Sequence, residues 1–308
     1  MRRAKLPDGR RFAFTVFDDT DQATLDNVRP VYELLQRLGM KTTKSVWVFP
    51  ADDPGNPHYR SHTLQDEGYM EFIERLNGAG FEIAFHNASP GSSERETTIS
   101  ALEHFRKKLG YYPRAHVNHE SNRENLYWGH ERLDSPLLRP LMRLRGRQVS
   151  QGHRPGSPFF WGDVCQRRIL YVRNFVFREI NLMRINPTMP YKDPNRPFVR
   201  YWFSSSEGGS VKSFNELISM KNQERLEREG GVCIAYTHFA SGFVKDGMVD
   251  PLTEELLTAM SERGGWFVPV STLLDHLRAQ SDTLHRPWTE RVNMELRWAL
   301  TKLVYGRA

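Results

Sequence analysis

Stretches with the residue pattern of strands alternate with stretches that have the spacing of helices, and this order limits the fold more than any other feature. Residues 11–17 (RFAFTVF) are rich in aromatic and β-branched residues and predict a buried strand. Residues 25–38 carry Leu and Val at helical spacing, and Gly39 ends the pattern. The alternation continues with strands at 44–49, 81–86 and 113–119 and helices at 69–76 and 97–109. It predicts an α/β fold with a parallel sheet or barrel.

The middle of the chain, about residues 129–209, interrupts the alternation. It contains arginine clusters, many prolines and aromatic, β-like pieces such as ILYVRNFVF. We interpret it as an insertion packed on the main domain. The pattern then resumes, with helices at 211–225, 253–263 and 272–280 and strands at 231–236 and 266–270. The sequence thus predicts one domain over residues 1–280, insertion included, followed by a tail over 281–308.

The tail contains an amphipathic stretch, residues 289–305 (TERVNMELRWALTKLVY). An apolar stripe runs along it through Val292, Leu296, Leu300 and Leu303. Most such stripes dock on the core of their own protein or on a second subunit, so we expect one of these two arrangements, which leaves an oligomer open. Peripheral contact with a membrane surface is the alternative.

Composition excludes several classes of protein. No run of about 18 apolar residues occurs, so no spanning helix is predicted, and the basic N-terminus leads into no signal-peptide pattern. Cys165 and Cys233 lie far apart without metal-type spacing, which suits a cytoplasmic protein. The 43 Lys and Arg against 37 Asp and Glu permit an anionic partner or simply a basic surface. We expect no nucleic-acid partner, because the sequence has no zinc-finger spacing, RNA-recognition signature or suitable basic helix.

Polar side chains with catalytic chemistry gather at the ends of the predicted strands. Asp18, Asp19 and Asp21 directly follow the first strand, and the histidines His86, His116, His119 and His238 lie at or just after the ends of three others. In a barrel of parallel strands the C-terminal ends meet on one face. Residues far apart in the sequence would therefore share one site.

Each of these residues has a simpler explanation on its own. A single histidine at a strand end is more often a satisfied polar residue than a ligand, and Asp21 could cap the helix that follows it. Asp18 and Asp19 together with His86 and His238 instead favour a metal. Carboxylate and neutral imidazole groups suit zinc or a similar divalent ion.

Three segments resemble motifs of one family. FAFTVFDDTD is similar to the first motif of the polysaccharide deacetylases (the NodB-homology domain, carbohydrate esterase family 4), GFEIAFHNAS to the second and GGVCIAYTHFASGF to the last. The resemblance covers about residues 11–277 and implies a distorted (β/α) barrel. It implies Asp18 as general base, Asp19 and His86 as ligands of a divalent metal, and His238 as general acid.

The sequence departs from the family pattern at two places. Pro90 occupies the position of the family's second ligand histidine, and the third motif reads HVNHESN. Our hypothesis is that His119, or alternatively His116, supplies the missing ligand, with Glu120 as a further candidate. The chain resembles a divergent cytoplasmic branch associated with the assembly of surface polysaccharide, including lipopolysaccharide.

The resemblance implies a carbohydrate substrate that loses an N-acetyl group, and leaves open whether that sugar is nucleotide-linked or lipid-linked. Near Asn118 a backbone N–H could stabilise the oxyanion. Glu120, Trp128 and Arg173 are further candidates for substrate binding, although a structural role is as common for residues of these types. Two alternatives remain: a catalytically inactive carbohydrate-binding protein, which Pro90 suggests, and a metal hydrolase acting on another ester or amide.

Overall fold

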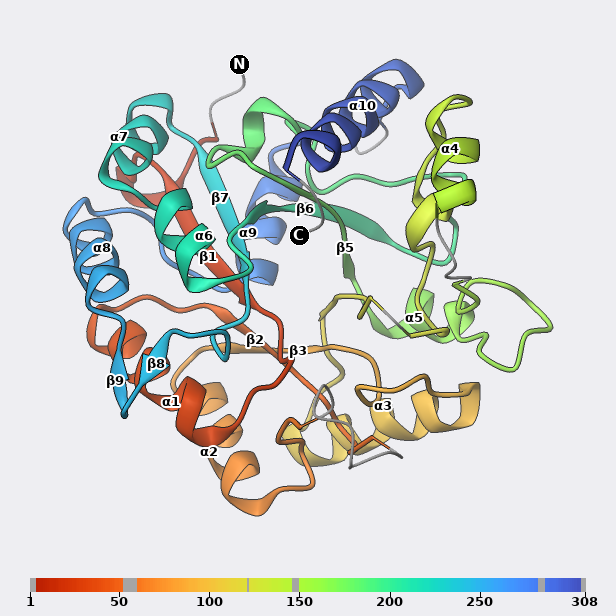
Figure 1. Cartoon of the computed structure of the whole chain (residues 1–308), viewed down its shortest axis with the longest axis horizontal. Helices are drawn as coiled ribbons and strands as arrows, with labels where there is room; N and C mark the ends of the chain where they lie inside the picture. The colour runs from red at the N-terminus through yellow and green to blue at the C-terminus, as the bar shows by residue number, and fades with distance from the viewer. Residues whose placement is uncertain (1–3, 52–59, 121, 146–149, 282–285, 306–308) are drawn as a thin grey trace.

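Seven parallel strands form a closed barrel in chain order, with the first strand paired to the last (Figure 1). The computed structural model describes residues 4–51, 60–120, 122–145, 150–281 and 286–305. The barrel strands are β1 (Ala13–Asp18), β2 (Thr43–Val46), β3 (Glu82–Phe85), β4 (Ala115–His116), β5 (Tyr171–Phe177), β6 (Tyr201–Glu207) and β7 (Val232–Thr237). A small hairpin, β8 (Val244–Lys245) with β9 (Met248–Val249), lies outside the barrel. The predicted α/β barrel is confirmed.

Helices surround the barrel on its outside (Figure 1). They are α1 (Leu25–Arg37), α2 (Glu67–Gly78), α3 (Arg95–Leu109), α4 (Leu138–Arg145), α5 (Gly162–Arg168), α6 (Val211–Leu217), α7 (Met220–Glu229), α8 (Pro251–Glu262), α9 (Val270–Ala279) and α10 (Trp288–Tyr305). The described residues also contain the short 3-10 helices η1 (Pro7–Gly9), η3 (Gly129–Arg132) and η4 (Leu182–Arg184). In the described part of the chain, no helix has both the length and the hydropathy that crossing a membrane requires.

The predicted insertion is wrong in one respect, because β5 and β6 lie within residues 129–209 and both belong to the barrel wall. Polar residues in both segments kept them from being predicted as barrel strands. Arg173 and Asn174 interrupt the apolar pattern of β5, and three buried serines, Ser204 to Ser206, do the same in β6. The segment that joins the two strands also lacks the usual long helix: only η4 lies in it.

Two smaller predictions also change. The predicted strand 266–270 is reduced to a single bridge between Ala13 and Trp266, and α9 begins at Val270. The helix cap predicted at Asp21 is wrong, because α1 begins after Thr24. There the side chain of Asn27 accepts a hydrogen bond from the backbone N–H of Thr24 at 2.8 Å. This reciprocal cap leaves Asp21 free for other contacts.

The tail docks on the protein's own core, but not through the predicted stripe. Helix α10 buries Met294 and Trp298, and the Trp298 ring packs 5.5 Å from that of Phe175 on β5. Leu296 and Leu300 of the predicted stripe are instead 41% and 60% exposed. The Leu303 side chain lies outside the described residues. The buried face also carries two charged residues, Arg291 and Glu295, which the apolar spacing alone could not place there.

Those charges hold α10 to the segments beside β5 and β6. Arg291 pairs with Asp134 at 2.7 Å and with Asp193, while Glu295 accepts hydrogen bonds at 2.8 Å from the backbone N–H groups of Asp134 and Ser135. Buried carboxylates and guanidinium groups require such partners, because a buried charge without one is costly. These contacts therefore fix which face of α10 packs on the barrel and where along the helix the contacts lie.

Candidate active site

The C-terminal ends of the barrel strands bring four predicted site residues together with Asp21. Asp19 and Asp21 follow β1, His86 follows β3, His119 lies beyond β4 and His238 follows β7. Asp21 is at their centre: its Oδ1 lies 3.4 Å from Nε2 of His86 and 3.4 Å from Nε2 of His119. Its Oδ2 lies 2.8 Å from Nε2 of His238. One carboxylate thus faces three imidazoles.

His238 carries a proton on each ring nitrogen. Its Nδ1 lies 3.0 Å from the carbonyl oxygen of Gly209, which can only accept, and its Nε2 faces the carboxylate of Asp21. Burial alone would lower the pKa of His238, but the hydrogen bond and charge of Asp21 raise it to about 9. Burial alone would raise the pKa of Asp21, whereas His86 and the bond to His238 hold it well below its usual range. The pair is an imidazolium bound to a carboxylate.

His86 has the features of a metal ligand. Both of its ring nitrogens are buried and have no hydrogen-bond partner among the described residues. Buried polar atoms are nearly always paired, so this unused capacity calls for an explanation. The ring packs against Trp47, with 4.5 Å between centroids, which fixes its orientation. Ligand atoms of Asp19, Asp21 and His86 all lie within 4.8 Å of one another.

His119 is oriented in the same manner. Its Nδ1 lies 2.9 Å from Oδ1 of Asn122, an acceptor, so Nδ1 carries the hydrogen and the Nε2 lone pair is directed toward Asp21. Burial lowers the pKa of His119 and so favours its neutral form, in which imidazole binds metals. The residues around Asp21 therefore fit a divalent cation.

Asp19 is held by an arginine of β5. Both carboxylate oxygens accept hydrogen bonds from Arg173, at 2.8 Å from Nη1 and with Nη2 as the second donor. The guanidinium group also lies 4.5 Å from the Tyr236 ring centroid. Burial alone would lower the pKa of Arg173, but Asp19 raises it. This bidentate pair fixes the Asp19 carboxylate beside Asp21.

Asp18, expected to be the general base, is enclosed in the barrel. It is fully buried, and its Oδ2 lies 2.9 Å from Nζ of Lys44 and accepts a hydrogen bond at 3.0 Å from Tyr32. Its Oδ1 accepts another at 2.9 Å from the backbone N–H of Phe239. A base must reach the proton that it removes. This geometry does not fit the role expected of Asp18, and it fits a structural ion pair.

The other candidates lie in different surroundings. His116 bonds the carbonyl oxygen of Phe85 and the side chain of Asn118, both at 3.2 Å, and burial lowers its pKa to about 3, so it is a satisfied core residue rather than a ligand. The Asn118 side chain also bonds both backbone groups of Leu126. Glu120 is exposed. The ring of Trp128 is covered on one face by the guanidinium group of Arg132 at 3.7 Å.

Two features of the site were missed by sequence reasoning. Asp21 was assigned to a helix cap, although Asp19 and Asp21 are two residues apart, a spacing that places side chains on one side of an extended segment. That spacing was an available signal. Arg173 was expected to contact substrate, and nothing in the sequence pairs it with Asp19, which is 154 residues away.

Comparisons with known proteins define the class of fold. No protein-family model matches the sequence, and no curated protein matches it either. Solved structures do match. A putative polysaccharide deacetylase from Mycobacterium smegmatis superposes with a TM-score of 0.52 at 14% identity, over 93% of this chain and 98% of that one. A probable polysaccharide deacetylase from Pseudomonas aeruginosa gives 0.51 at 10%, over 91% and 95%.

A further similar structure is Puue allantoinase, with a TM-score of 0.50 at 11% identity, over 91% of this chain and 94% of that one. Identities this low establish the fold alone. The chain has the (β/α) barrel of the polysaccharide deacetylases, as its motifs indicated.

Proposed function

We propose that the protein is a metal-dependent hydrolase that removes the acetyl group from an N-acetylated sugar. The observation that supports this most is the placement of Asp21 between His86 and His119, with both nitrogens of His86 buried and without a hydrogen-bond partner among the described residues. The resemblance of the three motifs to deacetylase motifs supplies the substrate class. Zinc is the metal that this donor set suits best.

Asp21, His86 and His119 would hold the metal, so His119 takes the place of the histidine that Pro90 replaces. A divalent ion there supplies Lewis acidity toward a carbonyl group and lowers the pKa of water. Trp47 covers the rings of His86 and His119, with centroids 4.5 Å and 5.1 Å away, and excludes solvent from that side. Asn122 fixes the tautomer of His119.

Asp19 would serve as general base in place of Asp18. It accepts the proton of the attacking water, while Arg173 keeps the carboxylate oriented. His238 would serve as general acid. Its Nε2 proton passes to the departing amine, because an amide nitrogen leaves poorly without one.

The biological setting is also part of this proposal. The resemblance to the branch associated with surface-polysaccharide assembly supports a cytoplasmic enzyme that acts on a nucleotide-linked or lipid-linked sugar. The exposed Leu296 and Leu300 of α10 support peripheral contact with a membrane. Helix α4 contacts α10, and Leu137, Leu141 and Leu144 in and beside α4 are exposed as well. The exposed Arg143 adds a positive charge that suits anionic lipid.

The alternative is hydrolysis of another amide. The same fold occurs in a protein described as an allantoinase, so the barrel alone does not select acetamido sugars. Acetate release from N-acetylated amino-sugar donors, measured with and without chelator, tests the proposal. We expect release that chelator abolishes and zinc restores. Metal-dependent hydrolysis of cyclic amides with no acetate release would support the alternative instead.

The catalytic roles need a matched pair of variants. Asp19→Asn removes the proposed base, and Asp26→Asn makes the same change at an exposed position of α1. We expect Asp19→Asn to lose about 10²- to 10⁴-fold in turnover and Asp26→Asn to keep full activity. Activity at the wild-type level in Asp19→Asn would remove Asp19 from the mechanism.

A further inference from the structure

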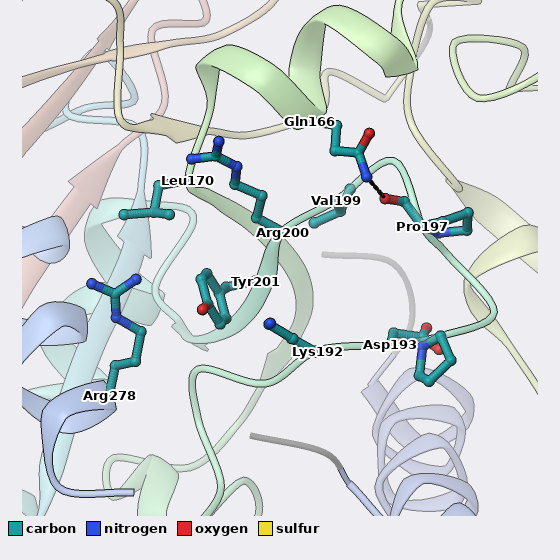
Figure 2. Close-up of a pocket in the computed structure, with 10 residues that line it drawn as sticks. Gln166, Leu170, Lys192, Asp193, Pro197, Val199, Arg200, Tyr201 and Arg278 are labelled. Atoms are coloured by element: carbon teal, nitrogen blue, oxygen red, sulfur yellow. Dashed lines mark hydrogen bonds between the residues drawn. The ribbon is translucent and has the colours of Figure 1, made fainter. Parts of the chain in front are cut away.

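Figure 2 draws the residues that line a pocket. This pocket has a volume of about 440 Å³ and lies at the opposite end of the barrel from the candidate active site. Leu170, which directly precedes β5, and Tyr201, the first residue of β6, form part of its wall. Because the strands are parallel, their first residues lie away from the face where Asp21 meets the histidines. The pocket is therefore separate from that site, and its volume is within the range of small-molecule sites.

Three cationic side chains line this pocket. Nζ of Lys192 lies 5.5 Å from the centroid of the Tyr201 ring, and Cζ of Arg278 lies 5.1 Å from the same centroid. Figure 2 shows Tyr201 between these two side chains, with Arg200 above it. In the part of the chain that the structure describes, neither Lys192 nor Arg200 forms a salt bridge with a carboxylate. Like charges gathered in one hollow repel each other unless an anion joins them.

The nearby carboxylates do not neutralise these charges. Asp193 lines the pocket, but its Oδ2 is engaged by Arg196 at 2.7 Å and by Arg291. Asp275 lies 3.4 Å from Arg278, yet it is shared with Arg114 at 2.7 Å. Asp275 is thus shared between two arginines, and Asp193 belongs to a cluster in which Arg196 and Arg291 also pair with Asp134, so neither acid pairs with Lys192 or Arg200. The pocket consequently keeps a positive potential, which attracts anions and is focused by the concave surface.

We propose that this pocket binds a small anion that carries a diphosphate group, because its three cations match the several negative charges of that group. Arginine guanidinium groups bind phosphate oxygens in a bidentate manner, and Lys192 supplies a mobile point charge beside them. The Tyr201 ring holds the cations of Lys192 and Arg278 beside the pocket through cation–π contacts. The inference rests on the pocket alone and holds whether or not the protein is a deacetylase.

Calorimetric titration with inorganic pyrophosphate and with adenosine diphosphate tests the proposal. We expect both probes to bind wild-type protein, with an affinity that falls as salt is raised. The double variant Lys192→Ala/Arg200→Ala should lose at least about tenfold in affinity. Both side chains are exposed, so the variant is expected to fold, and an unchanged melting temperature confirms it.

Two further variants separate this site from general charge effects and from the active site. Arg29→Ala/Lys221→Ala removes the same charges from exposed positions on α1 and α7 and should bind both probes as wild type does. Asp21→Asn should also bind them normally. The proposal is overturned if neither probe binds wild type at low salt, if the two double variants lose affinity equally, or if Asp21→Asn abolishes binding.

Discussion

Asp21 and His238 are 217 residues apart in the sequence and meet at 2.8 Å, Oδ2 to Nε2, across the C-terminal mouth of the barrel. The contact joins the loop after β1 to the loop after β7, two strands that pair along six positions. A rigid strand pair thus sets the distance between the carboxylate and the imidazole. Such support is what a site needs to hold a proton at a defined atom.

We expect His238 of the metal-free protein to titrate at a pKa of about 9, above its usual value, because of Asp21. In Asp21→Asn the carboxylate charge is absent, so the pKa should fall by more than one unit. Histidine ring signals followed by NMR across pH measure both values. Added zinc should lower the wild-type value as well, since a cation at Asp21 opposes the charge on His238. An equal pKa in wild type and Asp21→Asn would contradict the pair.

His238→Gln should reduce turnover about 10²- to 10⁴-fold if His238 protonates the leaving amine. Metal content should stay at the wild-type level, because His238 is not among the proposed ligands. Steady-state acetate release together with metal analysis separates these effects. A variant that keeps wild-type turnover would exclude His238 as the acid.

The buried pair Asp18 and Lys44 should act on stability. Lys44→Met leaves the Asp18 carboxylate buried without its cation, and we expect a loss of about 3–5 kcal/mol in the free energy of unfolding. Urea unfolding measures this loss. The comparison is Lys41→Met, two residues before β2, where the lysine is less buried. If Lys44→Met were as stable as the comparison, Asp18 would not depend on this pair.

Glu124 should make the protein less stable as the pH rises. Burial raises its pKa from 4.5 to about 7. The folded state therefore holds a proton that the unfolded state releases, so this contribution is complete below pH 4.5 and is lost as pH rises through about 7. Because one pKa unit corresponds to about 1.4 kcal/mol, the loss is on the order of 3 kcal/mol.

The Glu124→Gln variant isolates this effect, since an amide does not titrate. Melting temperatures at about pH 5 and about pH 8 should fall less between the two values in the variant than in wild type. Identical pH dependence in the two proteins would show that Glu124 does not carry it.

Contact with a membrane predicts binding to anionic vesicles. Leu296→Ser/Leu300→Ser removes exposed apolar groups from α10, whereas Leu252→Ser changes an exposed leucine on α8. Vesicles that contain phosphatidylglycerol should sediment wild type and Leu252→Ser, and the α10 variant should bind more weakly. Equal binding by all three proteins, or none by wild type, would count against this contact.

The strands that could be predicted from the sequence are those whose residues are mostly apolar. β1 and β7 were predicted for this reason. The β5 segment was noted as β-like but was assigned to the insertion, and β6 was not predicted, because Arg173 and the serines of β6 make buried polar contacts that periodicity does not reveal. The histidines of the site could be predicted from their positions at strand ends, because the topology of a parallel barrel gathers those ends on one face.

The roles of the three aspartates could not be assigned in the same way. Each role is decided by a partner from another strand: Lys44 of β2 for Asp18, Arg173 of β5 for Asp19, and the histidines for Asp21. These partners are distant in sequence, and a motif read along the chain carries no information about them. Likewise, the buried charges Arg291 and Glu295 set which face of α10 docks.

Metal content after exhaustive dialysis tests the central claim most directly. Wild type and Asp19→Asn, each supplied with zinc and then dialysed, should retain one metal ion per folded chain, and Asp21→Asn should retain none. Zinc retained by Asp21→Asn but lost from Asp19→Asn would contradict the account and return the ligand to Asp19, where the family resemblance places it.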